Sequence, residues 1–208
     1  NMVLVQHVAG YAVSLFAETY GTNLGQMYYA GKCLRTFLEV SLIYRRVNET
    51  HLLDMSFHQK ALLYREFHLA KSLAARIRFR VEKGNTMFDI WNELGDHVTQ
   101  LGEAFIERAI HEAFMRSIEE LPEDSSIKKV LTDLCQFYAL WHISKNSSWY
   151  LESGYFSPAK SKAVRSLVNH LCQNISEIAL PLVNSWALPD KVFSGTIAAP
   201  EFPLNHGY

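Results

Sequence analysis

Apolar residues recur every three or four positions in four long stretches of this sequence, and this spacing constrains the fold most. It places the apolar residues on one side of an α-helix. The first stripe consists of Leu63, Phe67, Ala70, Ala74, Ile77 and Val81. The others consist of Met87, Trp91, Leu94, Val98, Leu101 and Phe105; of Ile127, Leu131, Leu134, Tyr138 and Trp141; and of Val164, Val168, Leu171, Ile175, Ile178 and Leu182. Charged residues such as Arg65 and Arg76 are expected to face away from the core. Four such stripes predict an all-α helical bundle.

The breaks between the stripes carry residues that end one helix and begin the next. Gly84 follows the first stripe, and Thr86 can accept a hydrogen bond from the first turn of the next helix. In the segment WYLESGYFSPAKSKAVRSL, we expect Gly154 to adopt the left-handed conformation that closes a helix. Ser157 then caps the following helix, whose first residue is Pro158. These residues predict structural joints and not a catalytic loop.

The two ends of the chain have a weaker pattern. A short helix is expected from Leu4 to Leu15 and is expected to end near Gly21. We place an approximate domain boundary near residues 48–51. Beyond Trp186 the periodicity stops and prolines appear, which predicts an extended tail. We therefore expect a boundary near residue 50, with residues 51–208 forming an α domain that ends in an extended tail.

Bulk charge and cysteine content exclude several classes of protein. Twenty basic residues against twenty-one acidic ones give a net charge of −1, so no nucleic-acid partner is expected. No apolar run reaches the roughly 18 residues that span a bilayer. The cysteines Cys33, Cys135 and Cys172 have neither zinc spacing nor a disulfide pattern, which favours a reducing or peroxisome-like compartment.

Local chemical motifs are scarce. Glu107 with His111, or Glu93 with Asp96 and His97, have helical spacing suited to a metal ion, but a di-iron bundle uses Glu-x-x-His pairs, which this sequence lacks. We favour solvated or core-edge histidines and expect no metal. A cluster of Arg76, Arg78, Arg80 and Lys83 could bind a coenzyme phosphate, although a solvated helix face is the more common meaning of such a pattern. Neither a nucleotide-binding loop nor a nucleophile elbow is present.

The segment from about residue 51 to residue 194 resembles the C-terminal helical domain of the acyl-CoA oxidases. The similarity is carried by Phe88, Trp91 and Asn92; by Ala104-x-x-Glu107-Arg108; by Leu131-x-x-Leu134-Cys135-x-x-Tyr138-Ala139-Leu140; by Glu152-Ser153-Gly154-Tyr155; and by Leu182, Val183, Pro189 and Asp190. These marks occur in order and include the joints between helices, which chance helical similarity would not preserve.

The first ten residues, NMVLVQHVAG, resemble the stretch that follows the catalytic glutamate in this family. On this resemblance, the glutamate lies three positions before Asn1, and Asn1 and Met2 lie near the FAD cofactor. Met2 stands where threonine is usual, and a methionine cannot donate the hydrogen bond of a threonine. The chain itself is therefore expected to contain no catalytic residue. The resemblance also implies that residues 1–50 are the end of an acyl-CoA dehydrogenase-like helical domain, with its last helix and a connector, and that residues 51–208 are the C-terminal α domain.

The resemblance implies an FAD-dependent oxidation of acyl-CoA to trans-2-enoyl-CoA that forms hydrogen peroxide. In this reaction a glutamate removes the α-proton, and the flavin takes the hydride and passes electrons to oxygen. It also implies a homodimer and a peroxisomal location, although the last four residues, Asn-His-Gly-Tyr, are not a Ser-Lys-Leu type address. The alternative is a non-catalytic helical interaction or dimerisation module of an oxidase-like protein.

Overall fold

The computed structural model describes residues 46–123 and 125–187, and this part of the chain is helical, without a strand. Its helices are α3 (Glu49–Leu52), α4 (Met55–Glu82), α5 (Met87–Glu93), α6 (Gly95–Glu119), α7 (Ser126–Lys145), α8 (Ser147–Glu152), α9 (Pro158–Ser176) and α10 (Ala179–Ser185). The prediction of an all-α protein is confirmed. The short helix expected near the N-terminus and the extended tail lie outside the described residues.

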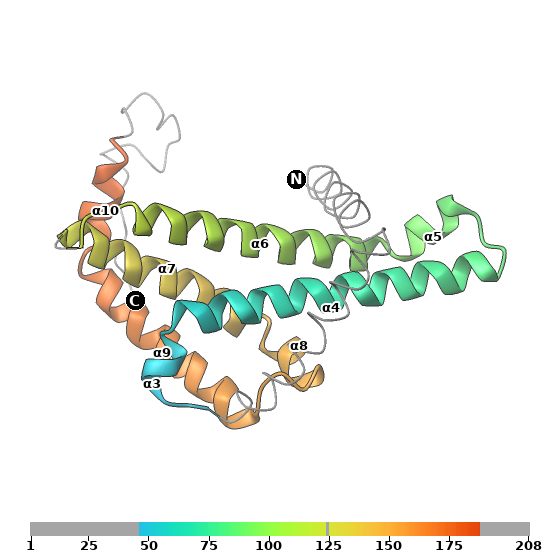
Figure 1. The fold of residues 1–208 in the computed structure, drawn as a ribbon, viewed down its shortest axis with the longest axis horizontal. Helices are drawn as coiled ribbons and strands as arrows, with labels where there is room; N and C mark the ends of the chain where they lie inside the picture. The colour runs from blue at the N-terminus through green and yellow to red at the C-terminus, as the bar shows by residue number, and fades with distance from the viewer. Residues whose placement is uncertain (1–45, 124, 188–208) are drawn as a thin grey trace, which may run out of the picture. The chain divides into compact units, whose positions relative to one another are not determined.

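The long helices α4, α6 and α7 pack against one another and form the centre of the bundle (Figure 1). One core cluster gathers Phe57 and Leu62 of α4 with residues of α7, α8 and α9, such as Tyr150, and with Phe156 from the joint between α8 and α9. A second cluster joins the later part of α4 to α5 and α6 through residues such as Leu73 and Ile90. The side chains of the two clusters therefore hold α4 along most of its length.

The described helices belong to two compact units of the chain. The first contains α3 to α8 and α9 as far as Leu171, and the second contains the end of α9 together with α10. In the second unit, α10 has no buried residue. The expected domain boundary near residue 50 stays a prediction.

The buried face of α4 differs from the predicted stripe. Ala74 and Val81 are exposed, whereas Ala61, Leu69 and the charged Arg65 are buried. The reason is that the first half of α4 is covered by several helices, so more than one face is buried there, while its last two turns are barely covered. A periodic pattern locates one face of a helix and cannot show where neighbouring helices begin or end.

The other stripes agree with the structure to different extents. Leu94, Val98 and Leu101 are buried as expected, but the second stretch is broken at Leu94 into α5 and α6. Ile127 and Trp141 are exposed, because α7 buries instead the face that carries Cys135, Ala139, Leu140 and Ile143. The fourth stripe is correct for Val164, Val168 and Leu171.

The predicted joints are confirmed. Thr86 Oγ1 accepts a hydrogen bond from the backbone N–H of Asp89 at 3.2 Å, which caps α5. Ser157 Oγ accepts from the N–H of Lys160 at 3.2 Å, and Pro158 is the first residue of α9. Gly154 has φ +70°, so it has the left-handed conformation that was expected before this helix.

None of the helices in the described ranges is both long and apolar enough to cross a membrane.

We expect Gly154→Ala to destabilise the fold by about 1 kcal/mol, because a Cβ is disfavoured at positive φ. Gly95→Ala is the matched control: neither glycine has an atom within 4 Å of the added Cβ, but only Gly154 has positive φ. Urea unfolding of both variants and the parent checks this expectation. Equal losses of stability in the two variants would show that the positive φ of Gly154 is not the cause of the destabilisation.

Candidate functional site

The residues predicted near the cofactor, Asn1 and Met2, lie outside the described residues. The described part of the chain offers instead a set of polar groups that the packing of α4, α6 and α7 encloses. These groups include the residues Glu107 and His111 that the sequence singled out as a possible metal pair.

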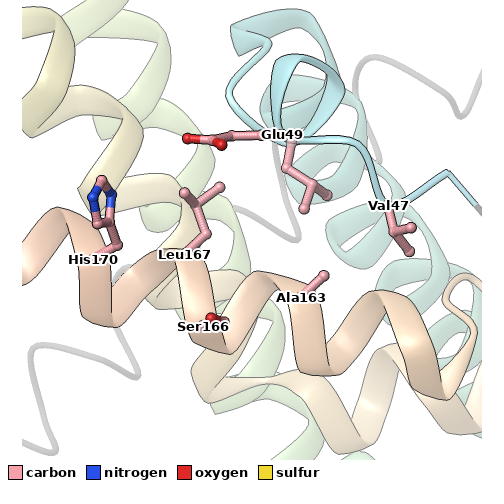
Figure 2. A pocket seen from close by; sticks show the side chains of 7 residues that line it. Val47, Glu49, Ala163, Ser166, Leu167 and His170 are labelled. Atoms are coloured by element: carbon pink, nitrogen blue, oxygen red, sulfur yellow. The ribbon is translucent and has the colours of Figure 1, made fainter.

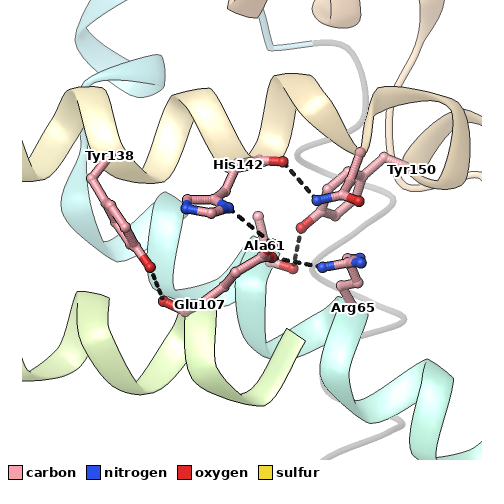
Figure 3. A network of polar contacts seen from close by, with 7 residues as sticks. Ala61, Arg65, Glu107, Tyr138, His142 and Tyr150 are labelled. Atoms are coloured by element: carbon pink, nitrogen blue, oxygen red, sulfur yellow. Dashed lines mark hydrogen bonds and ion pairs between the residues drawn. The ribbon is translucent and has the colours of Figure 1, made fainter. Parts of the chain in front are cut away.

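Glu107 is the centre of this polar network (Figure 3). It lies on α6 and is only 6% exposed. Its Oε2 accepts a hydrogen bond from Arg65 Nη1 of α4 at 2.6 Å, and its Oε1 lies 2.9 Å from His142 Nδ1 of α7. The hydroxyl of Tyr138 donates to the Glu107 backbone carbonyl at 3.4 Å. One carboxylate therefore contacts side chains of two neighbouring helices.

Further polar contacts surround the network. The Tyr150 hydroxyl, fully buried, donates to the carbonyl of Ala61 at 3.0 Å. Arg108, next to Glu107, pairs with Glu66 on α4 and with Glu112 at 2.7 Å. Burial raises the pKa of the Tyr138 hydroxyl to about 12, so this group is a hydrogen-bond donor at neutral pH and not a base. The arrangement joins helices and exposes no reactive group.

His58 and His111 form a second buried polar feature. Their ring centroids are 6.0 Å apart, and both side chains are fully enclosed. His58 Nε2 lies 2.6 Å from the carbonyl of Leu52, which can only accept, so Nε2 carries the proton. Within the described residues, His58 Nδ1 and both ring nitrogens of His111 have no hydrogen-bond partner. Burial lowers the pKa of each histidine to about 4, so both are neutral at pH 7.

These contacts correct the interpretation of the histidines. His58 and His111 are core residues, and not solvated or core-edge ones, because helices cover them on all sides. Glu107 points to Arg65 and His142 instead of forming a metal pair with His111. Across the two described ranges, no three His, Cys, Asp or Glu side chains are grouped as a metal site would need.

The basic cluster at the end of α4 is partly engaged within the protein. Arg80 donates two hydrogen bonds to the Glu93 carboxylate, at 2.6 and 2.5 Å, which also removes Glu93 from the proposed grouping with Asp96 and His97. Arg76 Nε donates to Ser72 Oγ at 3.3 Å, and Lys83 lies over the ring of Phe79. This agrees with a helix face in solvent better than with a phosphate site.

Two other buried groups could in principle react. Burial raises the pKa of the Cys135 thiol to about 11, so it stays protonated and is a poor nucleophile. Lys160, on α9, lies 3.1 Å from His51 Nε2 and over the ring of Phe57. Its pKa falls to about 7, mainly through burial and secondly through Arg46. Its ammonium group is enclosed between α3, α4 and α9, so a substrate has no direct access to it.

A groove of about 350 Å³ lies between α3 and α9. Figure 2 shows Glu49 and Val47 on one side of the groove and Ser166, Leu167 and His170 of α9 on the other. Glu49, Ser166 and His170 are exposed to solvent. The volume is that of a small-ligand site, but its polar groups are spread along the rim and do not converge. The groove was not foreseen, because periodicity does not show which face of α9 meets α3.

We expect Glu107→Gln to destabilise the fold by about 3 kcal/mol, because Arg65 would remain buried without a counter-charge. Glu93→Gln is the control, because it removes the same charge from the exposed pair with Arg80 and should have a much smaller effect. Urea unfolding at pH 7 gives both values. A loss of stability at Glu93 as large as that at Glu107 would mean that burial of the ion pair is not the cause.

We expect the free energy of unfolding to fall as the pH drops from about 6.5 to about 4. In this window the unfolded chain protonates His58 and His111, while burial keeps them neutral in the folded state. His111→Phe should reduce this dependence and raise stability at pH 7 by about 1 kcal/mol, since two unpaired nitrogens are removed. His170→Phe, at an exposed position, should leave the pH dependence unchanged. Urea unfolding at pH 7.5, 5.5 and 4.5 tests this, and an unaltered pH dependence in His111→Phe would contradict it.

Comparison with known proteins identifies the chain's relatives. The acyl-CoA oxidase family model matches residues 54–200. The peroxisomal acyl-coenzyme A oxidase 2 of Arabidopsis thaliana is 32% identical over 95% of this chain and 29% of its own length. An acyl-coenzyme A oxidase-like protein of Mus musculus is 29% identical over 97% of this chain and 31% of its own. The chain therefore spans about 30% of the length of these relatives.

Solved structures share the fold. An acyl-CoA oxidase from tomato matches with a TM-score of 0.71 at 18% identity, and it covers 91% of this chain and 28% of its own. Acyl-CoA oxidase-1 of Caenorhabditis elegans, crystallised with FAD and ATP, matches with a TM-score of 0.70 at 23% identity, with the same coverage of both chains. The marks that carried the resemblance, including the Glu107-Arg108 step and the Gly154 joint, lie within the matched region. This chain belongs to the acyl-CoA oxidase family.

Proposed function

We propose that this chain is the C-terminal helical part of an FAD-dependent acyl-CoA oxidase, which converts acyl-CoA and oxygen to trans-2-enoyl-CoA and hydrogen peroxide. The observation that carries the proposal is the family match over residues 54–200 together with a fold shared over 91% of the chain. The described residues then have the role of a scaffold, in which the buried ion pair of Arg65 and Glu107 joins α4 to α6.

The cofactor assignment concerns the start of the chain. Asn1 and Met2 are proposed to lie at the edge of the FAD site, and we assign no residue between 46 and 187 to the cofactor. The buried groups of that region support this division, because Glu107 is already paired with Arg65 and Cys135 is held protonated. The proton-abstracting glutamate is proposed to precede Asn1 in the longer protein, where FAD supplies the redox chemistry.

The location and assembly follow from the same proposal. Relatives from Arabidopsis thaliana and Homo sapiens are named as peroxisomal acyl-coenzyme A oxidases, which supports a peroxisomal location for this protein. A homodimer is proposed for the longer protein, with this helical part contributing dimer contacts.

A second function is a non-catalytic interaction or dimerisation module of an oxidase-like protein. Met2 favours it, because a methionine at a position where the family usually has threonine removes a hydrogen-bond donor beside the cofactor. The residues that precede Asn1 distinguish the two functions: a Glu-Gly-acidic sequence favours the enzyme.

We expect the 208-residue chain alone to release no hydrogen peroxide with acyl-CoA, and the longer protein that contains it to do so. Replacing the upstream glutamate by glutamine should lower turnover about 100-fold or more, because a positioned general base is lost. Peroxide release with short, medium and long acyl-CoA, measured with FAD added, provides the test.

Size-exclusion chromatography of the glutamine variant is the control, since the assembly should remain intact. Flavin-dependent turnover by the 208-residue chain alone would refute the proposal that the catalytic residues precede Asn1. No turnover by the longer protein with any acyl-CoA would favour the non-catalytic module, and Met2→Thr is then the first substitution to test for restored activity.

A further inference from the structure

Helix α3 is held in place by side chains of three other helices. Lys160 of α9 lies with its Nζ 3.1 Å from His51 Nε2. His58 Nε2 of α4 donates to the carbonyl of Leu52 at 2.6 Å, and Gln136 Nε2 of α7 donates to the carbonyl of the next residue at 2.8 Å. A helix of four residues is too short to be stable by itself. The position of α3 therefore depends on these contacts.

Two of the three contacts require neutral histidine rings. The ammonium form of Lys160 can only donate, so His51 Nε2 is the acceptor and carries no proton. A second proton on this ring would place two donors against each other. His58 already donates from Nε2, and within the described ranges its buried Nδ1 has no partner. A proton on Nδ1 would add a buried charge without an acceptor, so α3 in this position disfavours protonation of both rings.

The charged groups around the two rings do not favour protonation either. Those near His51 are Lys160 on α9, Lys60 on α4, Arg46 before α3 and Asp54 after it. Those near His58 are His111 on α6, Asp54 and His51. The carboxylate of Asp54 is already engaged, because it accepts from the N–H and the hydroxyl of Ser56 at 2.9 and 2.7 Å. Burial, and for His51 secondly Lys160, lowers the pKa of each histidine to about 4.

Helix α3 covers two features of the bundle. Together with Val47 it forms one side of the groove, opposite Ser166 and His170 of α9 (Figure 2). It also helps to enclose the Lys160 amine, which lies between α3, α4 and α9. Along the chain, residues 1–45 are connected to α4 through this segment. A displacement of α3 would therefore widen the groove and expose the amine.

We propose that α3 is a proton-linked strap, which lies closed against α4, α7 and α9 while His51 and His58 are neutral and opens when they take up protons. In the open position both rings contact water, where the pKa of a histidine is about 6.5. Protons therefore bind more tightly to the open form, and the open fraction increases as the pH falls from about 6.5 to about 4. This property is independent of the proposed enzyme activity.

Amide hydrogen exchange, followed by mass spectrometry of peptides, measures the opening of α3 in the 208-residue chain. The reporters are the N–H groups of Leu52 and Leu53, which donate to backbone carbonyls at 3.1 and 2.9 Å. Each exchange rate is divided by the rate of an unstructured chain at the same pH, which gives a protection factor. Amides in the centre of α7, where Ala139 and Leu140 are fully buried, report on unfolding of the whole bundle.

We expect the protection of α3 to be lower than that of α7 at every pH. Between pH 6.5 and pH 5 it should fall roughly 100-fold, or about 10-fold for each histidine. His51→Gln should leave a fall of about 10-fold, because a glutamine oxygen can still accept from Lys160 and does not titrate. His170→Gln, at an exposed position on the same groove, is the matched control and should keep the full pH dependence.

Gln136→Leu tests the geometry without changing a titrating group. It removes the donor from α7 to the backbone of α3 and should lower the protection of α3 about 5-fold at each pH, with an unaltered pH dependence. Equal protection of α3 and α7 would show that α3 opens only when the whole bundle unfolds, which would overturn the proposal. A full pH dependence in His51→Gln would also contradict it, because the opening would then not involve proton uptake by His51.

Discussion

The arrangement of the central helices depends on the contacts that the Glu107 carboxylate makes with Arg65 and His142. The carboxylate lies in an apolar interior, where an unpaired charge would be strongly unfavourable, and it contacts Arg65 of α4 and His142 of α7 from its own position on α6. Apolar side chains alone permit helices to slide or rotate at small cost. A buried charge is costly without its partners, so this network favours the alignment of α4, α6 and α7 in which Arg65 and His142 reach Glu107.

In this bundle, the buried polar side chains described above hold neighbouring helices together. Glu107, Arg65 and Tyr138 would attract attention as catalytic residues if seen as a set in a cleft. Here they lie between helices: Arg65 Nη1 donates to the Glu107 carboxylate, and the Tyr138 hydroxyl donates to the Glu107 backbone carbonyl. The exposed polar groups of the α3–α9 groove, by contrast, do not converge. In the described part of the chain, these buried polar groups therefore connect α4, α6 and α7.

Several features of the fold could be predicted from the sequence because they depend on local physics. The conformation of Gly154, the cap at Ser157 and the start of α9 at Pro158 follow from the backbone preferences of single residues. The burial of Arg65 and His111 could not be predicted in this way. Hydrophobic periodicity treats such residues as surface, and only the presence of Glu107 or of the helices around His111 makes burial possible. The same limit explains why Met87 and Trp91, apolar by pattern, are exposed.

The hydrogen bond from Tyr150 to the carbonyl of Ala61 has a consequence for the order of folding. It joins residues 89 positions apart, and the contact of Lys160 with His51 joins residues 109 apart, whereas Arg65 and Glu107 are separated by 42. Closing a longer loop costs more chain entropy, and contacts between distant residues slow folding. The pairing of α4 with α6 therefore costs less chain entropy than the docking of α8 and α9 onto the first turns of α4, and this difference favours a folding order in which α4 and α6 pair first.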